Sequence, residues 1–215
     1  MSEALEVFAL PLGPLQANCF IVVRGSEGLV IDPGDEAGVV IEAFTEFAFD
    51  PAAVLVTHGH FDHFGGVAPL ARHFDIPVYV GAADAAEMAD PGLGAFGGFD
   101  VEPVAGPVLL EGEQTLALPI AVQAIPTPGH SRGAFTFAID AHLFVGDLLF
   151  HGSVGRTDLP GGDMDQLLDS VATLVRRFPA DTPVHCGHGP DTSLGRELAL
   201  NPFLSPLRHD PGHRW

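Results

Sequence analysis

Short apolar runs separated by turn residues dominate the first thirty positions of the chain. They cover residues 5–10, 19–23 and 29–31, and the last run closes in Asp32-Pro33-Gly34. Apolar runs of this length bounded by Gly, Pro and Asp are typical of strands joined by turns. The pattern predicts three strands in a meander.

The apolar spacing then changes to a helical period, at Val39, Val40, Ala43, Phe44 and Phe47. We expect a helix there, followed by a strand at 54–57, a helix at about 63–74, a strand at 77–80 and a short helix at 82–89. Residues 91–99 are rich in glycine, which costs a helix about 1 kcal/mol per residue. We expect a loop over that stretch.

The second half repeats this order of elements. Strands are predicted at 114–118, 120–125, 134–139, 142–145 and 184–186, with a short helix at 194–200. A longer helix is indicated by Leu167, Leu168, Val171, Leu174 and Val175. Two strand-rich halves with helices to cover one face of each predict one α/β domain over 1–215. Its architecture would be an αββα sandwich of two mixed β-sheets flanked by helices, with loops of both sheets meeting at one edge.

Composition narrows the function. The formal net charge is −19, and all nine basic residues are Arg. Nucleic acid is an unfavourable partner because its binders cluster cations against phosphates, and an anionic membrane surface is unfavourable for the same reason. The first six residues carry acids where a secretory peptide carries basic residues, and no apolar run approaches the ~20 residues of a membrane span. We expect a cytoplasmic protein with no membrane partner, as a monomer or a homodimer.

The segment Thr57-His58-Gly59-His60-Phe61-Asp62-His63 joins a predicted strand to a predicted helix. It places three imidazoles and a carboxylate on one loop, which a solvated polar connection does not require. Imidazole and carboxylate are the ligands of zinc, iron and manganese, whereas a calcium site would use oxygen alone. We interpret the segment as metal-binding.

Four ligands on one short loop cannot easily surround a single ion, so two ions are expected. Further ligands would then come from distant loops. Three polar residues each follow a glycine at the end of a predicted strand: His130, Asp147 and His188. Glycine lets the backbone turn sharply or approach a site closely.

These motifs, in this order, resemble the metallo-β-lactamase fold hydrolases and, among them, the glyoxalase II-like branch. The resemblance runs from about Asn18 to Phe203. It implies a first metal held by His58, His60 and His130 and a second held by Asp62, His63 and His188. It also implies that Asp147 bridges the two ions and that Asp62 orients a water between them.

Two divalent ions ~3.5–4 Å apart acidify a water and polarise a carbonyl, which suits hydrolysis. Zinc is the default expectation, with iron or manganese as alternatives. A small acyl-thioester is the expected substrate because a thiolate leaves without an acid to protonate it. Asp62 and Asp147 are then the expected catalytic residues.

The resemblance weakens towards the substrate. Full-length glyoxalase II proteins carry a C-terminal helical domain, yet only 27 residues follow His188. Where the family places a Lys and a Tyr for glutathione, this chain has Arg156 and Thr157. Arg156 is the expected substrate-binding residue, as an anchor for an anion, with a structural salt bridge as the alternative.

Other functions fit the same motifs. A mononuclear iron enzyme resembling persulfide dioxygenases shares the fold and the string from Gly155 to Asp158. A lactonase or another ester hydrolase could use the same two ions. A binding module without catalysis is disfavoured because every ligand type is retained.

Overall fold

The computed structural model describes residues 3–90 and 101–209 and arranges their strands in two six-stranded sheets and a two-stranded one. One large sheet has the order β1-β2-β3-β4-β5-β6 and the other β14-β13-β10-β9-β8-β7. The first sheet is formed by β1 (Glu6–Leu12), β2 (Ala17–Arg24), β3 (Glu27–Ile31), β4 (Asp50–Leu55), β5 (Val78–Gly81) and β6 (Val108–Leu110). The second is formed by β7 (Gln114–Leu116), β8 (Val122–Pro126), β9 (Phe135–Ile139), β10 (His142–Gly146), β13 (Pro183–Cys186) and β14 (Thr192–Ser193).

Both large sheets are mixed. In the first, β3, β4, β5 and β6 pair in parallel while β1 and β2 pair antiparallel. In the second, only β10 and β13 pair in parallel. The remaining strands, β11 (Leu149–Phe150) and β12 (Ser153–Val154), form the two-stranded sheet.

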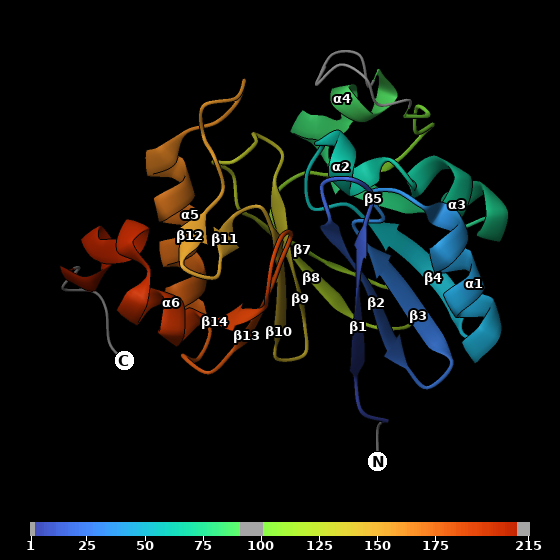
Figure 1. The fold of residues 1–215 in the computed structure, drawn as a ribbon, viewed down its shortest axis with the longest axis horizontal. Helices are drawn as coiled ribbons and strands as arrows, with labels where there is room; N and C mark the ends of the chain where they lie inside the picture. The colour runs from blue at the N-terminus through green and yellow to red at the C-terminus, as the bar shows by residue number, and fades with distance from the viewer. Residues whose placement is uncertain (1–2, 91–100, 210–215) are drawn as a thin grey trace.

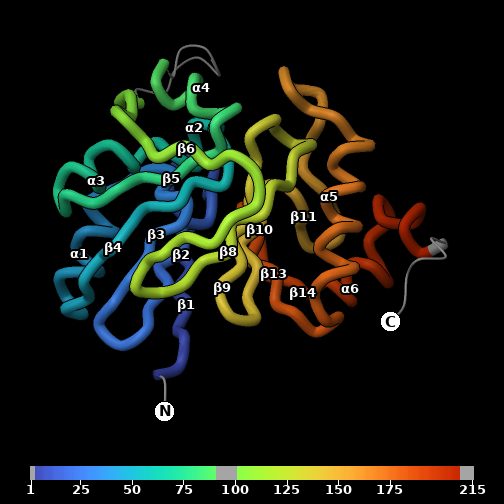
Figure 2. The backbone as a smooth tube through the Cα atoms, turned by 180° about the vertical axis from the view of Figure 1, so that it is seen from behind, coloured from blue at the N-terminus to red at the C-terminus, as the bar shows by residue number. Residues whose placement is uncertain are grey.

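Helices cover the outer face of each large sheet (Figure 1). One side carries α1 (Ala37–Phe47), α2 (Phe61–Phe64), α3 (Val67–Phe74) and α4 (Ala85–Ala89), the last after a 3-10 turn at Ala82–Asp84. The other side carries α5 (Met164–Arg177), α6 (Leu194–Leu200) and the 3-10 segment Pro202–His209. Figure 2 shows the same layers from behind. The predicted αββα sandwich is confirmed.

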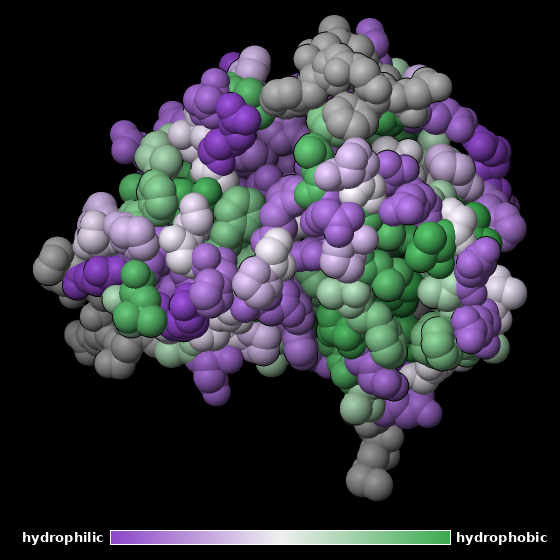
Figure 3. All heavy atoms as spheres, in the orientation of Figure 1, coloured by the Kyte–Doolittle hydropathy of each residue, from purple (hydrophilic) through white to green (hydrophobic). Residues whose placement is uncertain are grey.

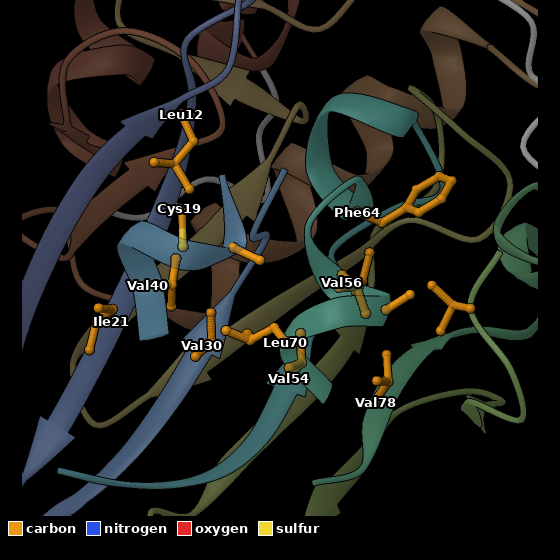
Figure 4. Close-up of a cluster of buried hydrophobic side chains, with 14 of the residues drawn as sticks. Leu12, Cys19, Ile21, Val30, Val40, Val54, Val56, Phe64, Leu70 and Val78 are labelled. Carbon is orange, nitrogen blue, oxygen red and sulfur yellow. The ribbon is translucent and has the colours of Figure 1, made fainter. Parts of the chain in front are cut away.

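Alternation along the strands explains the layers. In β2, Phe20 and Val22 pack between the two sheets, whereas Cys19, Ile21 and Val23 point towards α1 and α3. Both faces of this strand are buried, which accounts for its nearly continuous apolar run. Figure 4 shows the outer layer of this core around Cys19 and Val40. Burial raises the pKa of the Cys19 thiol far above its usual range, as expected of a structural cysteine.

Most predicted elements exist, with shifted bounds. The helix expected at about 63–74 is two helices, because the intervening backbone turns against the loop after β3, where the Gly66 N–H donates to the Pro33 carbonyl. The strand expected at 54–57 begins at Asp50, where pairing with β3 outweighs a weak local signal. The glycine-rich loop expected at 91–99 lies outside the described residues.

Apolar side chains gather on one outer surface. Phe8 on β1 and Phe47 on α1 are exposed, and each ring lies within about 6.5 Å of the Phe49 ring. Figure 3 shows hydrophobic residues over this side of the molecule. In the described ranges, no helix combines the length and the apolar character that crossing a membrane requires. The expected monomer or homodimer stays a prediction.

Candidate metal centre

The predicted histidine-rich segment leaves the end of β4 and enters α2. His58 and His63 are buried, and His60 occupies the position just before the first turn of α2. The other predicted ligands follow β8, β10 and β13 of the second sheet. Strand ends from both halves of the sandwich therefore supply the site.

His58, His60 and His130, hereafter the first trio, come together as predicted. One ligand atom of each lies within 4.8 Å of the others. The ring centroids are 4.6–4.7 Å apart and the rings are nearly perpendicular to one another. Three imidazoles around one point form the protein ligand set of some catalytic zinc sites.

Asp62, His63 and His188, hereafter the second trio, lie beside the first. Their ligand atoms also fall within 4.8 Å of one another. The Nε2 atom of His188 is 3.2 Å from the Oδ2 atom of Asp62, and the Nε2 atom of His63 is 3.9 Å from it. This trio contains a carboxylate, which the first trio lacks.

Asp147 lies between the two trios and presents one oxygen to each. Its Oδ1 atom is 3.3 Å from the Nε2 atom of His63, and its Oδ2 atom is 3.6 Å from the Nε2 atom of His130. This is the placement that a bridging carboxylate requires. Gly187 makes room for it, because a Cβ atom there would lie 2.3 Å from Oδ1 of Asp147.

Several buried polar atoms at this centre lack a hydrogen-bond partner. Among the described residues these atoms include Nε2 of His58, Nε2 of His63 and Oδ1 of Asp147. An unsatisfied buried polar atom costs about 1–3 kcal/mol, so such atoms need an explanation. A metal ion on each trio would satisfy them, and the donor set fits a borderline divalent ion.

The pKa values of the histidines differ between the two trios. Burial lowers the pKa of His58, and burial with the neighbouring His130 lowers the pKa of His60 to about 4. Burial also opposes charge on His63, but the carboxylates of Asp147 and Asp32 outweigh it and hold the His63 pKa well above its usual value. His58 and His60 of the first trio are therefore neutral at pH 7, whereas His63 of the second carries a proton that a metal must displace.

The pKa values of the two carboxylates, Asp147 and Asp62, are lowered by the neighbouring histidines. Burial alone would raise the pKa of Asp147, yet His63 and His130 reverse that effect and hold the pKa well below its usual value. Contact with Asp62 raises the pKa of His188. Burial opposes charge on Asp62 as well, but its hydrogen bond with His188 outweighs burial and lowers the Asp62 pKa. Both carboxylates are therefore ionised at neutral pH and available as ligands.

Two buried residues that were not predicted as site residues, Asp32 and Asn18, hold the ligands in place. Asp32 is buried and accepts from the N–H and hydroxyl of Thr57 at 2.7 and 2.6 Å, while its Oδ2 atom lies 2.9 Å from Nδ1 of His63. A carboxylate on the far nitrogen fixes the tautomer and turns Nε2 towards the centre. Asn18 donates to the carbonyls of Cys186 and Gly189, on either side of His188. In the sequence, Asp32 stands at the end of a predicted strand. An ordinary turn residue would occupy the same position, so the sequence alone does not indicate a role at the site.

Arg156 contributes through its backbone. Its carbonyl oxygen lies 2.8 Å from Nδ1 of His130 and so orients that ring. The guanidinium is exposed and forms two hydrogen bonds with Asp158, at 2.7 and 2.8 Å. The guanidinium therefore forms a salt bridge, which was the alternative role expected for Arg156. Its role as an anchor for an anion stays a prediction.

A small cavity of about 80 Å³ adjoins Asp62. Leu12 at the end of β1 and Leu15 in the β1–β2 turn line it, and Phe61 and Val101 add further apolar surface. Of the phenylalanines near the motifs, Phe64 is buried in the core, whereas Phe150 lies with its ring 6.1 Å from that of His188. Phe96 and Phe99 lie outside the described residues.

Several known proteins are similar to this chain in sequence and in fold. The profile of the Metallo-beta-lactamase superfamily matches residues 12–188. The chain is 37% identical to the "Probable metallo-hydrolase YqgX" of Bacillus subtilis (strain 168) over 91% of this chain and 96% of that one. It is 30% identical to the "Hydroxyacylglutathione hydrolase GloC" of Haemophilus influenzae (strain ATCC 51907 / DSM 11121 / KW20 / Rd), over 94% and 99%.

Two solved structures are similar throughout. TTHA1623 in a di-iron-bound form has 42% identity and a TM-score of 0.85, with 92% of this chain and 100% of that chain covered. The BLEG-1 B3 metallo-beta-lactamase has 37% identity and a TM-score of 0.87, with 93% and 100% covered. Both similarities cover more than nine-tenths of this chain.

Proposed function

The chain belongs to the metallo-β-lactamase superfamily, and we propose that it is the glyoxalase II-like member of a metallo-hydrolase group, cleaving a small acyl-thioester with two divalent ions. One observation carries the proposal. Asp147 directs one oxygen to each trio, and Nε2 of His58 and Nε2 of His63 are buried without a hydrogen-bond partner. Seven side chains from distant loops are combined in a way that a folding role does not require.

The first trio would hold one ion and the second trio the other, with Asp147 between them. When bound, such a pair supplies an acidified water and polarises a carbonyl. Zinc, iron and manganese all suit these ligands, and the TTHA1623 structure holds iron. Asp32 fixes the orientation of His63, and the Arg156 carbonyl fixes that of His130.

The substrate side of the proposal rests on two features. The cavity beside Asp62 offers apolar surface for an acyl or thiol group. A thiolate departs without protonation, so this reaction needs no general acid beyond the proposed metal ligands. Arg156 is proposed to attract anionic groups of the substrate when its pair with Asp158 opens. Identity to the hydroxyacylglutathione hydrolase supports the thioester class.

The test is turnover by purified protein loaded in turn with Zn²⁺, Fe²⁺ and Mn²⁺. Thiol release is measured from lactoyl esters of glutathione and of an uncharged thiol, beside oxygen uptake with a persulfide and hydrolysis of a lactone and a β-lactam. We expect about two metal equivalents and thiol release as the fastest reaction. One iron with oxygen uptake would contradict the proposal in favour of a persulfide dioxygenase.

β-Lactam hydrolysis is the second candidate, because BLEG-1 is 37% identical over nearly the whole chain. The same pair of ions would polarise a lactam carbonyl and supply the water that attacks it. A lactam turned over faster than every thioester would establish that reading. The lactone arm of the assay separates the ester hydrolase alternative in the same way.

A further inference from the structure

A buried carboxylate outside both trios connects the two loops that carry the first trio. Asp84 closes the 3-10 turn that follows β5, and only 3% of it is exposed. Its Oδ2 atom accepts from the N–H of Gly59 at 3.0 Å and from the hydroxyl of Ser131 at 2.5 Å. Its Oδ1 atom accepts from the N–H of Gly133 at 2.6 Å.

These donors sit immediately beside metal ligands. Gly59 lies between His58 and His60, and Ser131 directly follows His130. The first loop comes from the sheet of β4 and the second from the sheet of β8. One side chain thus ties together the two halves of the sandwich at the point where the three imidazoles meet.

The surrounding backbone is shaped for this carboxylate. A Cβ atom at Gly133 would lie 2.6 Å from the backbone nitrogen of Asp84 and 2.7 Å from its Cγ atom. A Cβ atom at Gly59 would lie 2.7 Å from the Asp84 carbonyl oxygen. Both loops therefore approach Asp84 more closely than any residue with a side chain would allow.

We propose that Asp84 is a positioning residue that sets His130 against His58 and His60, and so fixes the metal affinity of the first trio. The inference rests on the proposed metal centre. An amide cannot replace this carboxylate, because both oxygens accept hydrogen bonds and an NH₂ group would face a donor. Loss of an outer partner of this kind typically weakens metal binding 10- to 100-fold.

The test measures Co²⁺ affinity by visible absorption, in competition with a chelator. His188→Ala leaves only the first trio intact, and His60→Ala leaves only the second. We expect Asp84→Asn to weaken Co²⁺ binding about 10- to 100-fold in the His188→Ala protein. In the His60→Ala protein we expect less than a threefold change.

Glu197→Gln is the matched control. Glu197 is equally buried and accepts from the N–H of Gly152 and the amide of Asn201, away from the first trio. We expect it to lower thermal stability as Asp84→Asn does, with less than a threefold effect on Co²⁺ affinity in either background. A merely structural role for Asp84 would give the Glu197→Gln result or weaken both trios alike, and either outcome overturns the inference.

Ser131→Ala covers the case in which Asp84→Asn does not fold. It removes one of the three hydrogen bonds, and we expect a loss of about 3- to 10-fold at the first trio alone. Unchanged affinity in a folded Ser131→Ala protein would then overturn the inference. Wild-type protein that binds no Co²⁺ would instead contradict the proposed function.

Discussion

The two trios hold three ligands each, yet they prepare for a metal in opposite ways. The first consists of imidazoles alone, and burial lowers the pKa of His58 and His60. The second pairs histidines with carboxylates, and the pKa values of His63 and His188 are raised. One sequence segment, 58–63, thus supplies two histidines with lowered pKa values to one half-site and one histidine with a raised pKa to the other.

The two trios also differ in the residues that support their ligands. Asp84 connects the loops of the first trio, whereas Asp32 faces a ring of the second. Asp147 is the one described ligand that faces both. Variants at these positions therefore act on one half-site or on both.

Replacing the shared ligand should have the largest effect. We expect Asp147→Ala to lower thioester hydrolysis by at least ~1,000-fold, because both half-sites lose a ligand and the charge that separates the ions. Secondary structure measured by circular dichroism should stay unchanged. The exposed Asp169→Ala serves as the control for loss of an acid, and near-normal turnover in Asp147→Ala would rule out a bridging role.

Removing one ligand from each trio should separate the half-sites. We expect His60→Ala and His188→Ala each to retain about one metal equivalent instead of two, measured by elemental analysis. Turnover should fall by at least ~100-fold in each, since a bound ion supplies several kcal/mol of transition-state stabilisation. Two equivalents in either variant would show that the trios are not independent sites.

Metal affinity should depend on pH differently at the two trios. A proton on His63 competes with a metal at neutral pH because the pKa is raised, whereas His60, with a pKa of about 4, is already neutral. Affinity of the second trio should therefore rise up to about tenfold per pH unit between pH 6 and 8, whereas His58 and His60 should add no such rise at the first.

Calorimetry in two buffers of different ionisation enthalpy counts the protons released, using His60→Ala and His188→Ala to isolate each trio. Equal proton release from both trios would contradict the electrostatic difference. Greater release from the first would reverse it.

The smallest effect is expected at Arg156. Its guanidinium is exposed and paired with Asp158, and such surface pairs contribute little to stability because solvent screens them. Arg156→Ala should raise KM by about 2- to 10-fold for anionic thioesters and less for neutral ones. Asp158→Ala, which frees the guanidinium, should lower KM for the anionic substrates. Equal effects on both substrate classes would exclude an anion anchor.

The sequence predicts the sandwich well because its strands carry strong local signals. The run in β2 and the helical period of α5 are long enough to be recognised without tertiary information. The two- and three-residue strands β6, β11, β12 and β14 are too short for that and form through pairing with neighbours. The break between α2 and α3 likewise depends on contact with the loop after β3.

The predicted ligands meet because each closes a strand or begins a helix, and such positions converge at one edge of the sandwich. Asp32 and Asp84 could not be recognised in this way. Asp32 resembles a turn residue and Asp84 a member of a short helix, and their importance lies in contacts made across 25 or more positions of the chain. Neither contact leaves a local pattern.

The most direct test is a crystal structure of the metal-loaded protein with anomalous scattering at the metal edge. The account predicts two peaks, one beside His58, His60 and His130 and one beside Asp62, His63 and His188, with Asp147 contacting both. A single peak, or two peaks with Asp147 turned away from one of them, would contradict it.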